Sequence, residues 1–260
     1  MEEAVRGALV NRKWVVRPRP VATPEVRVIC FPHIGAGASV FTGWADRLPA
    51  SVELCAVRFP ARENRLDEPP IEDMPELLDT LCSVLAPLMR DRFVLFGHCS
   101  GSVVAFELAR RLRETGGPRP ELLAVSGIEA PSVRSVASPF HLLPRDELFA
   151  KVAEFGGVAP EVLGDPDLME MFEPVLRADY RLIERTGYVP GPPLDVPIVV
   201  VGGLHDLNVS YEAIAAWRWE TSRSFSLYMY PTSHFVLDES SYLLADLLGG
   251  EPSRDCGGPR

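Results

Sequence analysis

Lysine and long apolar runs are scarce in this sequence of 260 residues. Lys13 and Lys151 are the only lysines, so arginine supplies nearly all of the 26 basic side chains, and 36 acidic side chains outnumber them. The formal net charge is therefore −10. Because a nucleic-acid backbone would be repelled on average, we expect no nucleic-acid partner.

No stretch reaches the roughly 18 apolar residues that a membrane-spanning helix needs, and no secretory signal pattern follows Met1. The sequence therefore predicts a cytoplasmic protein without a membrane partner. The five cysteines are odd in number and include no Cys-x-x-Cys pair, which argues against both a disulfide framework and a zinc site. We expect reduced thiols, no metal and no other cofactor.

The length and the hydrophobic content of 47% suit one large α/β domain. Short β-branched runs alternate with helical patterns, as in a mainly parallel sheet that helices cover on both faces. The predicted strands are 26–31, 52–58, 93–96, 122–126, 198–201 and 225–229. The predicted helices between them are 42–48, 75–89, 102–113, 211–220 and 240–248. We expect residues 1–248 to form a single domain and 249–260, which contain Cys256, to form a flexible tail.

The stretch at about 139–190 interrupts this alternation with two successive helical patterns and no strand between them. One pattern places Leu148, Val152 and Phe155 on a single stripe, and the other runs from Leu168 to Ile183. A hairpin that thickens the core and a lid over a substrate channel both fit. We favour a lid, because such insertions commonly lie above the carboxyl ends of the strands, where ligands bind.

A predicted strand runs into a predicted helix through the turn Gly97-His98-Cys99-Ser100-Gly101. This is the nucleophile-elbow pattern with cysteine at its centre, and its strained backbone requires glycine on both sides. The turn would lift the Cys99 side chain onto the N-terminus of the helix, whose dipole favours a thiolate. Taken alone, the motif is equally compatible with a tight turn that holds a buried, inert thiol.

Two further residues complete a candidate triad. Asp206 follows the predicted strand 198–201, and His234 follows the next one, so that nucleophile, acid and base occur in the order used by α/β-hydrolases. We predict that His234 withdraws the proton from Cys99 and later activates water, while Asp206 fixes the imidazole tautomer. Asp238 and His205 are the rival acid and base. We expect Asp238 to cap a helix instead.

The loop after the first predicted strand contains several small residues, so its backbone can approach a ligand closely. We predict that the N–H of Ile34 joins the N–H of Ser100 in an oxyanion hole. A dinucleotide site would need a third glycine and a helix opening at this loop, which the sequence lacks.

We expect His141 on the lid surface. The predicted substrate contacts are His33, Gly35, His98 and Phe235.

With these motifs the sequence resembles the type II thioesterases of polyketide and nonribosomal peptide biosynthesis, which are α/β-hydrolases. The likeness spans nearly all of 28–248. It rests on Phe31-Pro32-His33 with its glycine loop, Phe59-Pro60-Ala61-Arg62-Glu63-Asn64-Arg65, the elbow, Arg177-Ala178-Asp179-Tyr180, Asp206 with Trp217, and His234-Phe235. The resemblance implies an α/β-hydrolase fold with a helical lid, the triad and the oxyanion donors named above, and acyl groups delivered on the phosphopantetheine of an acyl or peptidyl carrier protein.

The elbow departs from the family, which usually has serine where Cys99 stands. A thioester on Cys99 would keep its acyl-transfer potential, so an amine or an alcohol could accept the acyl group as well as water. We expect hydrolysis first, and acyl transfer or product-releasing cyclisation by the same acyl-enzyme second. We also expect a monomer. Docking of an acidic carrier protein would need local arginines, either Arg177, Arg181 and Arg185 or Arg58, Arg62 and Arg65. Solvated faces with surface ion pairs explain these arginines at least as well.

Overall fold

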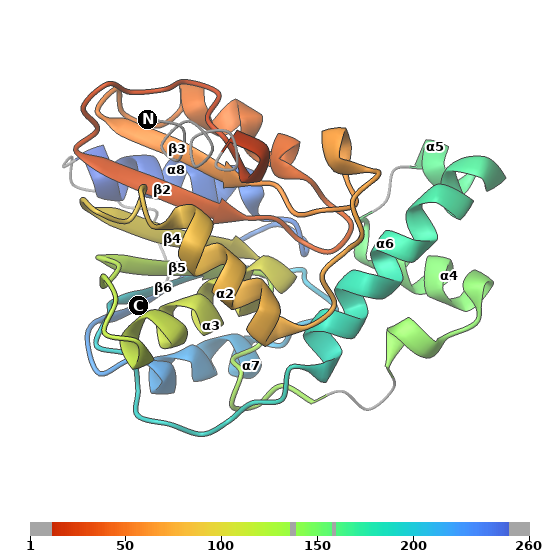
Figure 1. Ribbon diagram of the computed structural model, residues 1–260. Helices are drawn as coiled ribbons and strands as arrows, with labels where there is room; N and C mark the ends of the chain where they lie inside the picture. The colour runs from red at the N-terminus through yellow and green to blue at the C-terminus, as the bar shows by residue number, and fades with distance from the viewer. Residues whose placement is uncertain (1–11, 136–138, 158–159, 250–260) are drawn as a thin grey trace.

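The computed structural model describes residues 12–135, 139–157 and 160–249. Its centre is a seven-stranded sheet in the order β1-β3-β2-β4-β5-β6-β7 (Figure 1). The strands are β1 (Val15–Val16), β2 (Val26–Phe31), β3 (Val52–Val57), β4 (Phe93–His98), β5 (Leu122–Ser126), β6 (Ile198–Gly203) and β7 (Phe225–Tyr230). Only β1, beside β3, pairs in the antiparallel sense. The mainly parallel sheet predicted from the sequence is confirmed.

Helices cover both faces of this sheet. On one face lie α2 (Met74–Leu85), α3 (Ser100–Glu114), α7 (Tyr211–Ala215) and the 3-10 helix η4 (Ala216–Glu220), and on the other η1 (Ala38–Asp46) and α8 (Leu237–Gly249). Residues of β2 alternate between the two cores: Ile29 and Phe31 pack on the first face, Val28 and Cys30 on the second. Burial on both faces explains why the predicted strands were continuous apolar runs.

All six predicted strands are present, and their ends differ from the prediction by at most two residues. β1 was not predicted, since two residues are too few to show a pattern. The helix predicted over 75–89 ends early, at Leu85, because Pro87 has no N–H with which to continue it. The helix predicted over 42–48 is the 3-10 segment η1, which begins at Ala38.

The stretch between β5 and β6 forms a helical insertion outside the sheet, at the right of Figure 1. It comprises η3 (Phe140–Leu142), α4 (Arg145–Phe155), the short α5 (Pro160–Leu163) and α6 (Pro166–Arg185). Leu148, Phe149 and Val152 of α4 pack with Leu176 of α6 in a small apolar core of their own. The two helical patterns predicted here are confirmed, and α5 is an additional turn between them.

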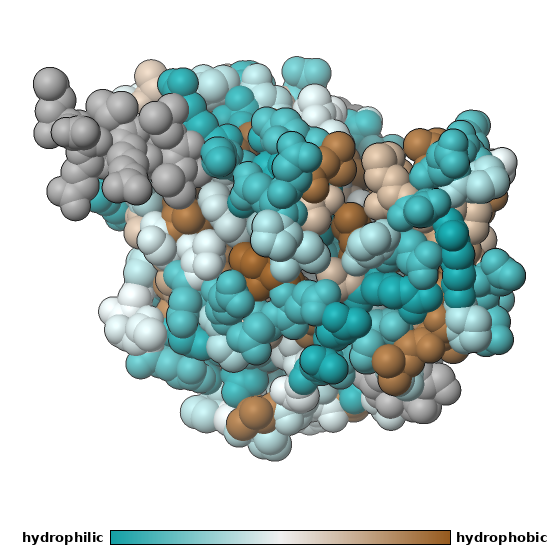
Figure 2. Space-filling model, turned by 45° about the vertical axis from the view of Figure 1, so that its right-hand side comes forward, coloured by the Kyte–Doolittle hydropathy of each residue, from teal (hydrophilic) through white to brown (hydrophobic). Residues whose placement is uncertain are grey.

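Figure 2 shows a largely hydrophilic face on which apolar residues form small, separate patches. Among the described residues, no helix has the length and apolar character needed to cross a bilayer. Nearly all of the tail predicted at 249–260 lies outside the described residues, since these end at Gly249.

Candidate active site

Cys99 stands between β4 and α3 with a φ of 51° and a ψ of −121°. This is the strained, positive-φ conformation of a nucleophile elbow. The N–H of Cys99 donates to the carbonyl oxygen of Ser126 at 2.8 Å, which ties the turn to β5. A Cβ added at Gly97 would lie 2.3 Å from the backbone of Gly101, and one at Gly101 would lie 2.1 Å from the Phe31 carbonyl oxygen. Both positions therefore require glycine.

Asp206 and His234 meet beyond the carboxyl ends of β6 and β7. Nδ1 of His234 lies 2.8 Å from Oδ2 of Asp206, and the two side chains are 5% and 0% exposed. Oδ1 of Asp206 accepts the N–H groups of Asn208 at 2.8 Å and Val209 at 3.3 Å. Burial acts to raise the pKa of Asp206, but these hydrogen bonds lower it overall. Asp206 is therefore a fixed carboxylate that orients the imidazole.

The imidazole of His234 interacts with Cys99 as well as with Asp206. Burial lowers the pKa of His234, but the hydrogen bonds and negative charges of Asp206 and Cys99 outweigh it and raise this pKa to about 10. Nδ1 is held by Asp206, so Nε2 is the nitrogen left for the thiol. Both neighbours therefore favour the protonated form of the ring.

The rival base His205 and the rival acid Asp238 are not part of the Asp206–His234 pair. His205 is exposed and makes no bond with Asp206 among the described residues. The prediction that Asp238 caps a helix is wrong. Because the Ser240 N–H donates to the carbonyl oxygen of Val236, α8 begins earlier than expected, and Asp238 lies inside its first turn, paired with Arg47.

His141 is a second correction, since it is buried rather than on the surface of the insertion. Its Nδ1 is bonded to Glu184 of α6, and the same carboxylate accepts the N–H groups of Phe140 and His141. An amphipathic pattern cannot show such a contact, because the two partners lie 43 positions apart in the sequence. His141 therefore helps to hold η3 against α6.

Cys99 and His234 line a cavity of about 430 Å³ between the sheet and the helical insertion. Ile34 and Ser100 line it too, and within the described part of the chain neither backbone N–H donates to an acceptor. Both groups are thus free to bind an oxyanion, and this role stays a prediction. A space of this size can hold an acyl chain.

Three predicted substrate contacts pack behind this cavity. The ring of Phe235 lies 5.0 to 5.4 Å, centroid to centroid, from the rings of His33, His98 and His234. His98 is fully buried, and its Nδ1 lies 2.9 Å from Oγ of Ser126. Burial lowers the pKa of His98 well below its usual value and that of His33 to about 4. These neutral rings support the imidazole, and their contact with substrate stays a prediction.

Gly35, the fourth predicted contact, is held by the helical insertion. Its N–H donates to Oδ2 of Asp179 at 2.8 Å, and the two carboxylate oxygens of Asp179 also accept from Arg62 at 2.8 and 2.9 Å. Nη1 of Arg62 donates to the carbonyl oxygen of Ala36 as well, at 3.1 Å. This junction was not predicted from the sequence. Its signal was a carboxylate at position 179 on the apolar stripe of α6, four residues after Val175.

Most of the arginines considered for carrier-protein docking are already engaged within the chain. Arg62 and Arg65 are buried, and Arg58 pairs with Glu63. On α6, Arg177 pairs with Glu173, and Arg181 pairs with Glu72. Among the described residues Arg185 alone of the six is exposed without an ion pair.

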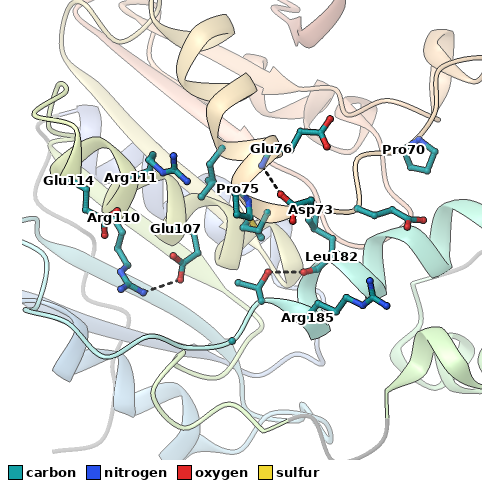
Figure 3. A pocket seen from close by; sticks show the side chains of 15 residues that line it. Pro70, Asp73, Pro75, Glu76, Glu107, Arg110, Arg111, Glu114, Leu182 and Arg185 are labelled. Carbon is teal, nitrogen blue, oxygen red and sulfur yellow. Dashed lines mark hydrogen bonds and ion pairs between the residues drawn. The ribbon is translucent and has the colours of Figure 1, made fainter.

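A larger cavity of about 640 Å³ lies where α2, α3 and α6 meet (Figure 3). Charged side chains dominate its wall, among them Arg110 with its partner Glu107. Neither Cys99 nor His234 lines it. The smaller cavity is therefore the candidate active site.

Comparison with known proteins agrees with this geometry. Residues 26–247 match the thioesterase domain family. The gramicidin S biosynthesis protein GrsT of Aneurinibacillus migulanus is 34% identical over 236 residues, which cover 91% of this chain and 92% of that protein.

Two solved structures are also similar. RedJ, a thioesterase from the prodiginine pathway of Streptomyces coelicolor, has a TM-score of 0.80 and 35% identity over 88% of this chain and 91% of its own. BorB, a type II thioesterase from the borrelidin cluster, has a TM-score of 0.82 and 35% identity, with coverage of 91% and 96%. The chain therefore belongs to the thioesterase family and has the α/β-hydrolase fold of the type II thioesterases.

Proposed function

We propose that this protein hydrolyses acyl or peptidyl thioesters on the phosphopantetheine arm of a carrier protein, with Cys99 as nucleophile, His234 as acid and base, and Asp206 as the orienting carboxylate. The observation that carries the proposal is the buried Asp206–His234 hydrogen bond of 2.8 Å beside the elbow thiol, in a cavity that Cys99 and His234 share. The likeness to a gramicidin S biosynthesis protein and to thioesterases of the prodiginine pathway and the borrelidin cluster supports the choice of substrate.

Acylation begins with the Cys99 thiolate beside the His234 imidazolium. The sulfur attacks the thioester carbonyl carbon, and the N–H groups of Ile34 and Ser100 stabilise the oxyanion that forms. Collapse of the tetrahedral intermediate breaks the bond to the pantetheine sulfur, which takes the proton from His234. The products of this step are acyl-Cys99 and a neutral imidazole.

Deacylation uses that neutral imidazole as a base. His234 takes a proton from water as the water oxygen bonds to the acyl carbon, while Asp206 stabilises the imidazolium. The bond to Cys99 then breaks, and the sulfur leaves as thiolate. The carboxylic acid departs, and the thiolate–imidazolium pair is restored.

Hydrolysis is favoured over acyl transfer and cyclisation. The matching family and the two structural relatives are thioesterases, and within the described residues no side chain of the cavity identifies an amine or alcohol acceptor. The helical insertion, whose Phe155 and Tyr180 line the cavity, acts as the lid through which the pantetheine arm enters.

The decisive experiment replaces Cys99 with alanine and measures thiol release from octanoyl-pantetheine. We expect kcat to fall by at least about 10³-fold, because the covalent route is lost. Mass spectrometry of the wild-type protein after rapid quenching should show an acyl adduct on the elbow peptide. Cys82→Ala is the matched control, since Cys82 is a half-buried thiol on α2 that does not line the cavity.

The control variant should keep wild-type turnover and the same adduct. Retention of more than a few per cent of activity in Cys99→Ala, or an adduct that appears on another residue, would remove the proposed mechanism.

A further inference from the structure

The lining of the active-site cavity is mixed. Ile128, Phe140 and Phe155 supply apolar surface, whereas Glu129, Arg134 and Tyr180 contribute polar groups. A chain of methylene groups would contact the apolar residues but would leave the polar groups without partners. The residues that line the cavity therefore indicate which kind of acyl group it binds.

Arg134 is only partly engaged by the protein. Nη2 donates to two carbonyl oxygens near the end of α6, those of Ile183 at 3.2 Å and Thr186 at 2.6 Å. Nη1 is buried, and no group in the described part of the chain accepts from it. A buried donor without a partner destabilises the protein, because it has lost its hydrogen bonds to water. Because Arg134 also lines the cavity, a rotation of its guanidinium would let an oxygen of a bound acyl group supply the missing acceptor.

The two carboxylates on the cavity wall do not neutralise Arg134 directly. Glu184 is already bonded to His141 and to backbone N–H groups, and Glu129 makes no ion pair within the described residues. Burial lowers the pKa of Arg134, and the charges of Glu129 and Glu184 oppose this effect. An anionic substituent would meet these carboxylates as well as the guanidinium, so the site suits a neutral oxygen.

Tyr180 offers a second donor on the same wall. Its hydroxyl has no hydrogen-bond partner in the described part of the chain, and its ring packs on Phe140 with centroids 5.1 Å apart. Burial and the nearby charge of Cys99 raise the pKa of this phenol, so it keeps its proton. The cavity lining thus contains two donors, Arg134 and Tyr180, as well as apolar residues.

We propose that Arg134 selects acyl chains that carry a neutral oxygen substituent, a hydroxyl or a keto group, over saturated chains of the same length. The inference rests on the proposed thioesterase function and names its substrate class. Discrimination follows from the asymmetry of hydrogen bonding, because a site built to donate rejects the analogue that cannot accept.

The test measures kcat/KM for octanoyl-pantetheine and for its analogues with one hydroxyl at carbon 3, 5 or 7. We expect the wild-type protein to prefer at least one hydroxylated chain by about tenfold or more. In Arg134→Met the ratio between that substrate and octanoyl-pantetheine should fall to within about twofold. The ratio cancels any general loss of activity that follows from the lost bonds to α6.

Arg110→Met is the matched control. Arg110 also donates to a backbone carbonyl oxygen, that of Val189 at 2.8 Å, but it lines the other cavity (Figure 3). This variant should keep the wild-type ratio. A further measurement uses the wild-type protein alone. An octanoyl-pantetheine analogue whose acyl chain ends in a carboxylate should be a poorer substrate than octanoyl-pantetheine, because Glu129 and Glu184 repel the added negative charge.

The outcomes separate the two proposals. Hydrolysis of octanoyl-pantetheine without preference for any hydroxylated chain would overturn the role of Arg134 and leave the thioesterase function intact. A preference that persists in Arg134→Met, or the carboxylate chain as the best substrate, would overturn it as well. If the wild-type protein hydrolyses none of these thioesters, the proposed function itself fails.

Discussion

Cys99 has a thiol where related enzymes usually have a hydroxyl. The two nucleophiles require different protonation states of the neighbouring imidazole. A serine must lose its proton during attack, so its histidine starts neutral. A thiolate is already the nucleophile, and a protonated histidine stabilises it. The raised pKa of His234, about 10, fits the second arrangement. In the proposed mechanism His234 therefore acts as an acid before it acts as a base.

This coupling predicts that removal of the thiol changes the titration of His234. In Cys99→Ala the hydrogen bond and the charge of Cys99 are lost, so the pKa of His234 should fall below its wild-type value of about 10. Histidine NMR signals followed over pH measure this directly. Cys82→Ala should leave the titration unchanged. An identical titration of His234 in the wild type and in Cys99→Ala would show that the two side chains do not interact.

The same shift has a defined sign for stability. The pKa of His234 is raised from 6.5 to about 10, so the folded protein holds a proton that the unfolded chain releases between these values. The resulting contribution to the free energy of unfolding is fully present below pH 6.5 and is lost as the pH rises through about 10. The stability difference between the wild type and His234→Gln should therefore shrink over this interval.

At the scale of elements, α6 of the helical insertion is fastened to the loop after β2. Asp179 binds both Gly35 and Arg62, and Arg62 in turn binds Ala36. This loop also carries Ile34, the proposed oxyanion donor. The insertion thus contacts the loop as well as lining the cavity, so we expect both stability and catalysis to depend on the junction.

Asp179→Asn tests this junction. The variant keeps the shape of the side chain but leaves the buried guanidinium of Arg62 unpaired, so the free energy of unfolding should fall by about 3 kcal/mol. The looser loop should also lower kcat for octanoyl-pantetheine. Urea denaturation and steady-state kinetics measure the two effects.

Glu154→Gln provides the comparison, since Glu154 pairs with Lys151 on the exposed surface of α4. Its stability should stay within about 0.5 kcal/mol of the wild type. Equal stability and turnover in Asp179→Asn and Glu154→Gln would mean that the contacts of Asp179 contribute neither to stability nor to catalysis.

At the scale of the whole molecule, the net charge of −10 disfavours the approach of an acidic carrier protein. The arginines considered for docking are mostly paired within the chain, so local attraction is weak, and the long-range interaction is repulsive. Salt screens this repulsion over roughly 10 Å at 0.1 M. The approach of the carrier should therefore become easier as ionic strength rises.

We expect KM for an acyl-carrier-protein substrate to fall when NaCl is raised from about 50 to about 300 mM, because screening reduces the repulsion. KM for octanoyl-pantetheine should not change, which controls for salt effects on the catalytic site. A KM for the carrier substrate that rises with salt would instead reveal an attractive basic patch. In that case charge reversal at Arg185 would be the first variant to examine.

Cytoplasmic location, the monomeric state and the division into one domain and a tail stay predictions.

The type of fold and the path of the chain could be predicted because their signals are local. Apolar runs marked the six longer strands, and two glycines four positions apart marked the elbow. The order of Cys99, Asp206 and His234 along the chain placed all three beyond strand ends, where a parallel sheet brings them to one edge.

Local sequence patterns were therefore enough to predict the sheet, the elbow and the set of residues available for the reaction. Three contacts became visible only in the folded chain: Asp179 binds Arg62 across 117 positions, His141 is buried against Glu184, and Arg134 lines the cavity beside Cys99. Local backbone preferences and hydrophobic periodicity act over a few residues. Pairing between distant side chains depends instead on how the helical insertion packs against the sheet, which no short stretch of sequence encodes.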